Sequence, residues 1–185
     1  GINMVPLATF AMDAYADDPC TEFRPILSGE AENLNEKSIR LTAQMHKAIA
    51  VMQFKLEAQL YEKHPEWKMQ DRELFNFIDY DHGTIMLEGK VYPLLSCHFP
   101  TIDPANPCVL TDEEHQLLQK LHHNFLVSEK LHKHIDMMLS HGCMYQVCNN
   151  NLLYHASVPL EEDGSLKKVE VYPGQPVAGM ELMET

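Results

Sequence analysis

The sequence predicts an α+β fold in which long amphipathic helices come first and short antiparallel hairpins follow. Apolar residues recur at the helical period of about 3.6 over two long stretches before residue 142. The pattern changes to the alternation of strands near residues 84–92 and again after residue 143. We therefore expect a mainly helical part, residues 1–142, with one small hairpin, and a strand-rich part, residues 143–185.

The first predicted helix covers residues 5–15. Its apolar side chains recur at helical spacing: Leu7, Phe10, Ala11 and Ala14. Asp17-Asp18-Pro19 ends it, because the residue before a proline is disfavoured in the helical conformation.

The strongest helix signal runs from Asn33 to about Lys63. Asn33 with Glu36 three residues later predicts an N-cap pair, whose side chains satisfy free backbone N–H groups. His64-Pro65 ends the helix. One broad apolar face is expected to pack against more than one neighbour: Leu41, Met45, Ile49, Met52, Phe54, Leu56, Leu60 and Tyr61.

In the middle of the chain the apolar pattern changes from the helical period to the alternation of strands. Residues 73–78 predict one or two helical turns, and residues 84–87 and 90–92 predict a β-hairpin around Glu88-Gly89. Three prolines keep the next segment extended: Pro100, Pro104 and Pro107.

Thr111 and Glu114 form a second capping box, which opens a helix that runs toward Gly142 as its C-cap. Its apolar side chains are Leu118, Leu121, Phe125, Ile135 and Leu139. Ser128 could restart the helix, so one long helix and two shorter ones both remain open. Beyond it, residues 144–147 and 152–155 predict a second hairpin around three asparagines, and residues 162–165 a third.

The composition excludes some classes of function. The formal net charge of −13 over 185 residues argues against binding the phosphate backbone of a nucleic acid, which requires clustered Lys and Arg. The same charge suits a phosphate-ester substrate poorly unless cations come from elsewhere. No apolar run of about 18 residues predicts a membrane span.

The five cysteines are odd in number, irregular in spacing and without a CxxC pair: Cys20, Cys97, Cys108, Cys143 and Cys148. They predict buried free thiols in a reduced, cytoplasmic setting. Nucleotide-binding glycine loops, a GxSxG elbow and an HExxH motif are all missing from the sequence. By itself the chain does not read as a complete enzyme.

Eleven histidines suggest a metal site. Five crowd one helical region, His122, His123, His132, His134 and His141, and His132 lies four residues before Asp136, where two side chains can share an ion. No third ligand is specified, so we favour exposed or hydrogen-bonded histidines on a helix surface.

Two lysines of the long helix, Lys47 and Lys55, lie among apolar residues together with Arg40 and His46. They could offer cations to a phosphate group or to a facing domain. We favour the alternative, in which they form the polar edge of an amphipathic helix.

His155 ends an apolar strand and precedes the small residues Ala156-Ser157. In layered α/β architectures reactive groups collect beyond the carboxyl ends of strands. His155 could therefore be a metal ligand, and a hydrogen-bonded histidine of the core is the alternative.

Four segments resemble class III fructose-1,6-bisphosphatases, a bacterial family of the calcineurin-like metallophosphatase superfamily, in order along nearly the whole chain. They are Val5–Ala11, the helix segment Met45–Gln59, Phe99–Pro104 with Thr111–Glu114, and the strand-and-turn segment Met144–Gly164. The resemblance implies a longer cytoplasmic parent that removes the 1-phosphate of fructose 1,6-bisphosphate in gluconeogenesis, with manganese as its metal.

The resemblance also implies which part of that parent is present. Residues 1–142 match a helical insertion between the two halves of the catalytic fold, and residues 143–185 the start of the second half, a partial metallophosphatase sheet. The DxH, GDxxDR and GNH[DE] metal motifs of the superfamily are missing from the sequence. His155 matches the first of two later histidine ligands, although Ala156 stands where the family usually has glycine.

We therefore expect an internal fragment that keeps at most one metal ligand, His155, holds no metal pair and is inactive by itself. Its partners would be the remaining phosphatase halves and, in the parent, fructose 1,6-bisphosphate. A rival interpretation is an interaction or regulatory module whose apolar helices face a partner or a second copy. A third keeps the superfamily but changes the substrate to another phosphomonoester.

Overall fold

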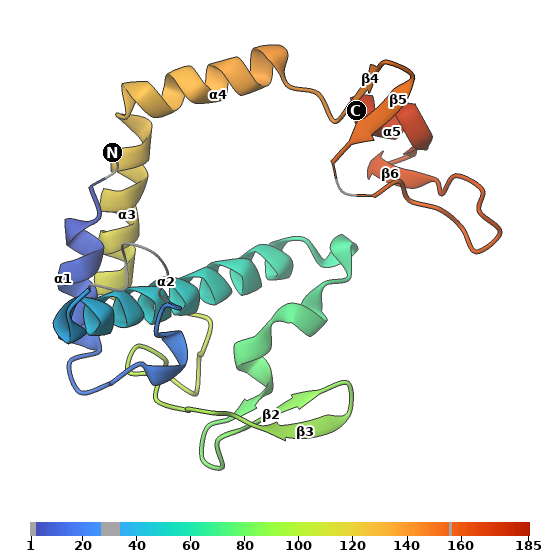
Figure 1. Ribbon diagram of the computed structural model, residues 1–185. Coiled ribbons are helices and arrows are strands. Elements are labelled where there is room, and N and C mark those ends of the chain that lie inside the picture. Colours follow the sequence, from blue (N-terminus) through green and yellow to red (C-terminus); the bar gives the residue numbers. More distant parts are fainter. Residues whose placement is uncertain (1–2, 27–33, 156) are drawn as a thin grey trace. The chain divides into compact units, whose positions relative to one another are not determined.

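The computed structural model describes residues 3–26, 34–155 and 157–185 (Figure 1). Helices and short antiparallel hairpins make up the structure, which confirms the predicted α+β class. The chain forms two compact units, Gly1–Ser128 and Glu129–Thr185. The boundary predicted after residue 142 falls inside the second unit, and the assignment of residues 143–185 to a phosphatase core stays a prediction.

Helix α1 (Val5–Ala14) occupies the predicted position. Pro6 lies in its first turn, where the missing N–H of proline breaks no helical hydrogen bond. Leu7 and Ala11 are buried and, with Tyr15 just beyond the helix, enter the main hydrophobic core of the first unit. The core therefore starts at the predicted apolar face of this helix.

Helix α2 (Glu36–Lys63) is the longest element. Asn33, the predicted N-cap, lies outside the described residues, and the cap that the structure shows is Asn35, whose side-chain oxygen accepts the Ser38 N–H at 2.9 Å. The helix ends before His64-Pro65, as predicted, and the 3₁₀ helix η3 (Pro65–Trp67) follows.

The face that α2 buries matches the predicted one only in part. Leu56 and Leu60 are 41% and 44% exposed, so their assignment to the packed face was wrong. Met52 and Tyr61 are buried as predicted, whereas Ile49 and Phe54, each 37% exposed, are not. The other buried residues of the helix are Ile39, Ala43, Gln44, Lys47, Ala48, Val51, Lys55 and Ala58. The three alanines let neighbouring segments approach the helix closely, and long polar side chains are buried beside them, so apolar character alone does not decide which face is buried.

A three-stranded antiparallel sheet follows α2, in the order β1 (Ile78–Asp79), β2 (Thr84–Leu87) and β3 (Lys90–Pro93). The predicted β2–β3 hairpin is confirmed, and its two turn residues, Glu88 and Gly89, both have positive φ as a two-residue hairpin of type I′ requires. The predicted turns at residues 73–78 are the 3₁₀ helix η5 (Leu74–Phe77). Two further 3₁₀ helices are η1 (Thr21–Phe23) and η4 (Gln70–Arg72).

Two helices, α3 (Asp112–Leu126) and α4 (Glu129–His141), cover the region where one long helix was the alternative. The predicted capping box is present at the start of α3, where the Glu114 N–H donates to Thr111 Oγ1 and the Thr111 N–H donates to Glu114 Oε2. At the end of α4 the Gly142 N–H donates to Met138 O at 2.7 Å. A Cβ on Gly142 would meet that oxygen at 2.2 Å, so the close approach requires glycine.

The second unit holds α4, two hairpins and a short helix. Strands β4 (Tyr145–Cys148) and β5 (Asn151–Tyr154) form the predicted second hairpin, and Asn149 and Asn150 at its turn both have positive φ. An isolated bridge between Leu160 and Leu166 stands at the predicted third hairpin. The hairpin of β6 (Val169–Tyr172) and β7 (Gln175–Val177), ahead of α5 (Gly179–Glu184), was not predicted. Within the described ranges no helix is both long enough and apolar enough to cross a bilayer.

Candidate functional site

His155 directly follows strand β5 at the open end of the β4–β5 hairpin. Its N–H donates to Met144 O at 3.4 Å, which extends the hairpin by one further contact. Its side chain is exposed, so the alternative of a core histidine was wrong. The neighbouring Ala156 lies outside the described residues, and the role of His155 as a metal ligand stays a prediction.

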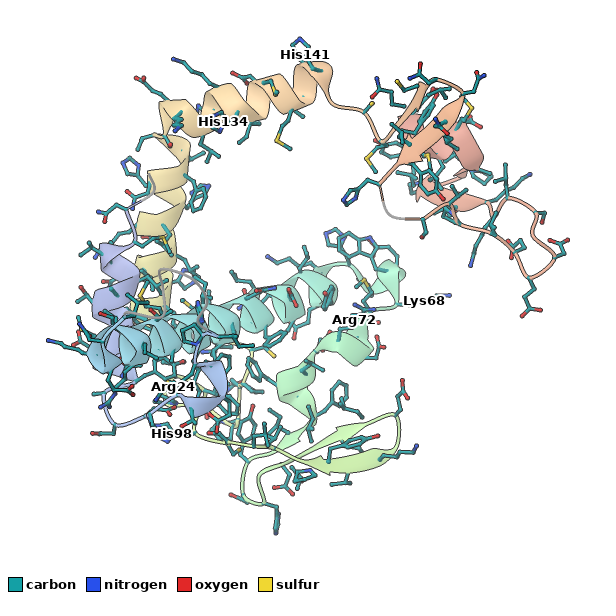
Figure 2. The ribbon with its side chains drawn as sticks, in the orientation of Figure 1. Arg24, Lys68, Arg72, His98, His134 and His141 are labelled. Atoms are coloured by element: carbon teal, nitrogen blue, oxygen red, sulfur yellow. The ribbon has the colours of Figure 1, made fainter. Side chains whose placement is uncertain are left out.

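The histidines of α3 and α4 do not converge on an ion. His122, His123, His132, His134 and His141 are all exposed, and Figure 2 labels two of them, His134 and His141, on α4. Across residues 3–26, 34–155 and 157–185 no three His, Cys, Asp or Glu side chains gather closely enough to hold a metal. The described residues therefore do not by themselves fit a metal centre.

Lys47 is an interior residue rather than part of a polar edge. Its Nζ lies 2.5 Å from Asp18 Oδ2, and the two side chains are 1% and 5% exposed. The Cys20 N–H donates to the other Asp18 oxygen at 2.8 Å. Burial by itself raises the pKa of Asp18, but the hydrogen bonds from Lys47 and Cys20 outweigh it and lower the pKa below its ordinary value.

Lys55 is buried in the same way, two turns further along α2. Its Nζ donates to Glu114 Oε2 at 2.7 Å and to Thr101 O at 2.6 Å, and both charged side chains are fully buried. Glu114 Oε2 also accepts the Thr111 N–H at 2.8 Å. One carboxylate thus caps α3 and neutralises a lysine of α2.

Neither interpretation of the two lysines was right. Each ammonium already has a carboxylate partner in the interior, so neither is a free cation for a phosphate group, and neither lies on a solvated edge. Arg40, by contrast, is exposed and donates to Ala16 O at 2.6 Å. No spacing rule on the sequence points from these lysines to Asp18 or Glu114, because the partners lie on other elements.

The five cysteines differ in burial, and Cys97 is half-buried. Cys20 and Cys108 are buried, as predicted, whereas Cys143 and Cys148 are exposed, so their prediction as buried thiols was wrong. Burial raises the pKa of Cys20 to about 11, which keeps this thiol protonated and unreactive at neutral pH.

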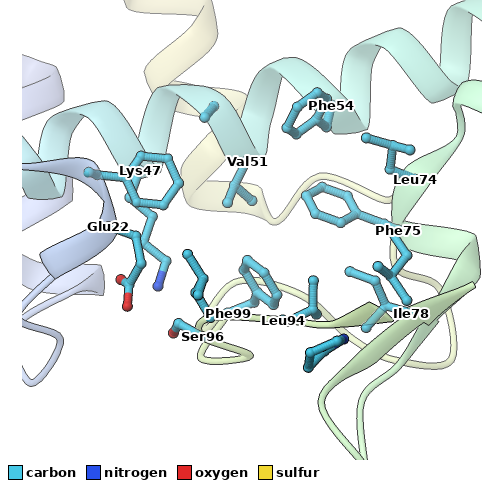
Figure 3. Close-up of a pocket in the computed structure, with 15 residues that line it drawn as sticks. Glu22, Lys47, Val51, Phe54, Leu74, Phe75, Ile78, Leu94, Ser96 and Phe99 are labelled. Atoms are coloured by element: carbon cyan, nitrogen blue, oxygen red, sulfur yellow. The ribbon is translucent and has the colours of Figure 1, made fainter. Parts of the chain in front are cut away.

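The first unit contains an apolar cavity of about 360 Å³ between α2, η5, the sheet and residues 94–99 (Figure 3). Three aromatic rings from separate elements meet in its wall. The ring centroids of Phe54 and Phe75 lie 5.8 Å apart, as do those of Phe75 and Phe99, with edge-to-face geometry in both pairs. Sequence reasoning missed this cavity, because only the tertiary fold brings the three rings together.

The sequence of this chain matches proteins of one family. A family model described as Firmicute fructose-1,6-bisphosphatase matches residues 1–185. The class 3 fructose-1,6-bisphosphatase of Bacteroides fragilis is 56% identical over 171 residues, which are 92% of this chain and 26% of that protein. The class 3 enzymes of Bacteroides thetaiotaomicron and Porphyromonas gingivalis are 53% and 50% identical over 184 residues, 100% of this chain and 28% of each protein. No solved structure matches.

This chain matches only part of the length of each relative, so the properties of the whole relatives cannot be assigned to it directly. The chain spans 26–28% of the length of these relatives, although nearly all of its own residues are matched. The resemblance seen in the sequence is thus confirmed along the chain, while most of each relative has no counterpart in it.

Proposed function

We propose, from the premise that this chain belongs to the Firmicute fructose-1,6-bisphosphatase family, that it serves as a segment of an enzyme that hydrolyses fructose 1,6-bisphosphate at its 1-phosphate. The observation that carries the proposal is an identity of 50–56% over 92–100% of the chain with class 3 fructose-1,6-bisphosphatases. The reaction would belong to gluconeogenesis in the cytoplasm. The remaining halves of the phosphatase would be the partners of this segment.

The metal of such an enzyme, which we take to be manganese, would supply Lewis-acid chemistry and an activated water when bound. The described residues offer it one imidazole, His155, whose side chain is exposed. A single imidazole falls short of the several ligands that such a site requires, so the other donors would have to come from outside the described residues. The expectation that this chain alone holds no metal pair and is inactive stays a prediction.

The charges of the chain support a scaffolding role for the first unit. The net charge is −13, and the two interior lysines are already neutralised by Asp18 and Glu114. These pairs join α2 to the segment after α1 and to the start of α3. The first unit therefore holds helices in place, and its described residues, 3–26 and 34–128, offer no buried unpaired cation to a sugar phosphate.

A segment exchange tests the proposal. The matching segment of the Bacteroides thetaiotaomicron enzyme is replaced by this chain, and manganese-dependent phosphate release from fructose 1,6-bisphosphate is measured. We expect the chimera to keep its activity and His155→Ala within it to lose about a hundredfold in kcat, because a metal ligand is removed.

The matched control for this exchange is His134→Ala, an exposed histidine on α4 that should leave the rate unchanged (Figure 2). A folded chimera without phosphatase activity would contradict the proposed function. An active chimera in which both histidine variants behave alike would remove His155 from the metal site and leave the function standing.

A second candidate, an interaction module, rests on α4. No residue of this helix is buried, and several of its apolar side chains are exposed: Ile135, Met137, Met138 and Leu139. We expect the chain to self-associate through these residues, and Met138→Glu with Leu139→Glu to shift sedimentation toward the monomer. A clean monomer at millimolar concentration would argue against the module.

A further inference from the structure

The apolar cavity of the first unit has the properties of a ligand site, and we propose that it binds a small organic amine, an apolar ring system that carries one positive charge. Its volume of about 360 Å³ falls in the range of about 300–1,000 Å³ that is typical of small-molecule pockets. The inference does not depend on the phosphatase activity.

The walls determine the apolar part of the ligand. Val51 and Phe54 face the cavity from α2, Phe75 from η5, and Phe99 from the segment that precedes α3 (Figure 3). The rings pack edge to face, with Phe75 in contact with both Phe54 and Phe99, so the aromatic part of the wall is continuous. A flat aromatic body would contact such walls in the offset and edge-on geometries that aromatic pairs prefer.

The polar groups determine the charge of the ligand. Glu22, Lys47 and Ser96 line one end of the cavity (Figure 3). The Lys47 ammonium is neutralised by Asp18 at 2.5 Å, whereas the exposed carboxylate of Glu22 has no ion pair among the residues that the structure describes. The uncompensated charge at this end is therefore negative, while the Phe99 ring is already paired with the Lys47 ammonium, whose Nζ lies 5.4 Å from the ring centroid. An anion such as a sugar phosphate is disfavoured here, and an ammonium group is favoured.

Two positions of the cavity wall can be substituted to test the apolar contact and the charge contact separately. Ala50 lies on α2 at the cavity wall and is half-buried, so a larger side chain there can enter the cavity without displacing the core. Glu22 is exposed, so its replacement should leave the fold intact. These two positions separate the apolar contact from the charge contact.

Binding of two matched probes, 1-naphthylmethylamine and 1-naphthoate, is measured by isothermal titration calorimetry with the full chain. We expect the amine to bind about tenfold more tightly than the acid, since one carboxylate at a partly solvated rim attracts the first and repels the second. Ala50→Trp should abolish binding of both probes while the circular dichroism spectrum stays unchanged. Glu22→Gln should reduce the preference to about twofold, and Glu62→Gln, an exposed carboxylate of α2 outside the cavity, should not change it.

Three outcomes would overturn the proposal. Equal binding of the amine and the acid would remove the role of Glu22, and binding to Ala50→Trp as tight as to the unchanged chain would place the probes elsewhere. A dimer that Ala50→Trp dissociates would show that a second copy, not a small molecule, covers the cavity. If Ala50→Trp fails to fold, Glu22→Lys serves instead, because it should invert the preference in favour of the acid.

Discussion

Lys55→Met is expected to lower the free energy of unfolding by about 3–5 kcal/mol, because the change leaves a buried carboxylate without its counter-charge. Methionine has nearly the same length and is apolar, so little packing is lost. The fully buried Glu114 carboxylate and the part-buried Thr101 carbonyl, which Lys55 Nζ contacts at 2.7 and 2.6 Å, would both lose a charged donor. Urea denaturation at pH 7, followed by circular dichroism, measures the loss.

Two further variants separate the ion pair from other effects of the Lys55 change. Lys63→Met makes the same substitution at an exposed position of α2, and we expect a change within about 0.5 kcal/mol. The double variant Lys55→Met with Glu114→Gln removes the stranded charge and should recover a large part of the stability. Equal effects of Lys55→Met and Lys63→Met would show that the buried pair does not hold α2 to α3.

Asp18→Asn is expected to lower the free energy of unfolding by about 3–5 kcal/mol at pH 7, because it leaves the Lys47 ammonium buried without its counter-charge. The effect should depend on pH. The pKa of Asp18 in the folded protein lies below its ordinary value near 3.8, so the carboxylate stabilises the fold fully above that value. This stabilisation is lost as the pH falls through the lower pKa of the folded state.

The difference in free energy of unfolding between the unchanged chain and Asp18→Asn should therefore be largest near neutral pH. It should shrink as the pH falls below about 3.8, where the unchanged chain also loses its carboxylate charge. Urea denaturation at a series of pH values between about 3 and 7 measures it. Asp17→Asn changes the exposed neighbour and should leave stability nearly constant throughout. A difference for Asp18→Asn that stays the same over the whole pH range would contradict the role of the ion pair.

The elements with purely local signals were predicted well. The capping box at Thr111 and Glu114, the hairpin around Glu88-Gly89 and the end of α2 before Pro65 all depend on a few neighbouring residues. The family was also visible from the sequence, because identity of about half the residues preserves whole segments. The β6–β7 hairpin was missed because its two strands are short and include Pro176.

His155 shows the limit of the sequence for the candidate site. The sequence alone placed it at the end of a strand, and the structure placed its side chain in solvent. Its proposed metal partners would have to come from outside the described residues, so no local pattern around it could have tested the assignment. The segment exchange is needed for that reason.

The sequence by itself determined the family of the chain, helices α1 and α2, the capped start of α3, and the β2–β3 and β4–β5 hairpins with their turns. Capping, turn geometry and apolar period act over a few residues, so these elements are visible locally. Tertiary structure alone decided which face of α2 is buried, and with it the place of Lys47 and Lys55. An ammonium can enter a core only where another element brings a carboxylate to within hydrogen-bond distance. Asp18 and Glu114 do so from distant parts of the chain, and no periodicity along α2 could have shown it.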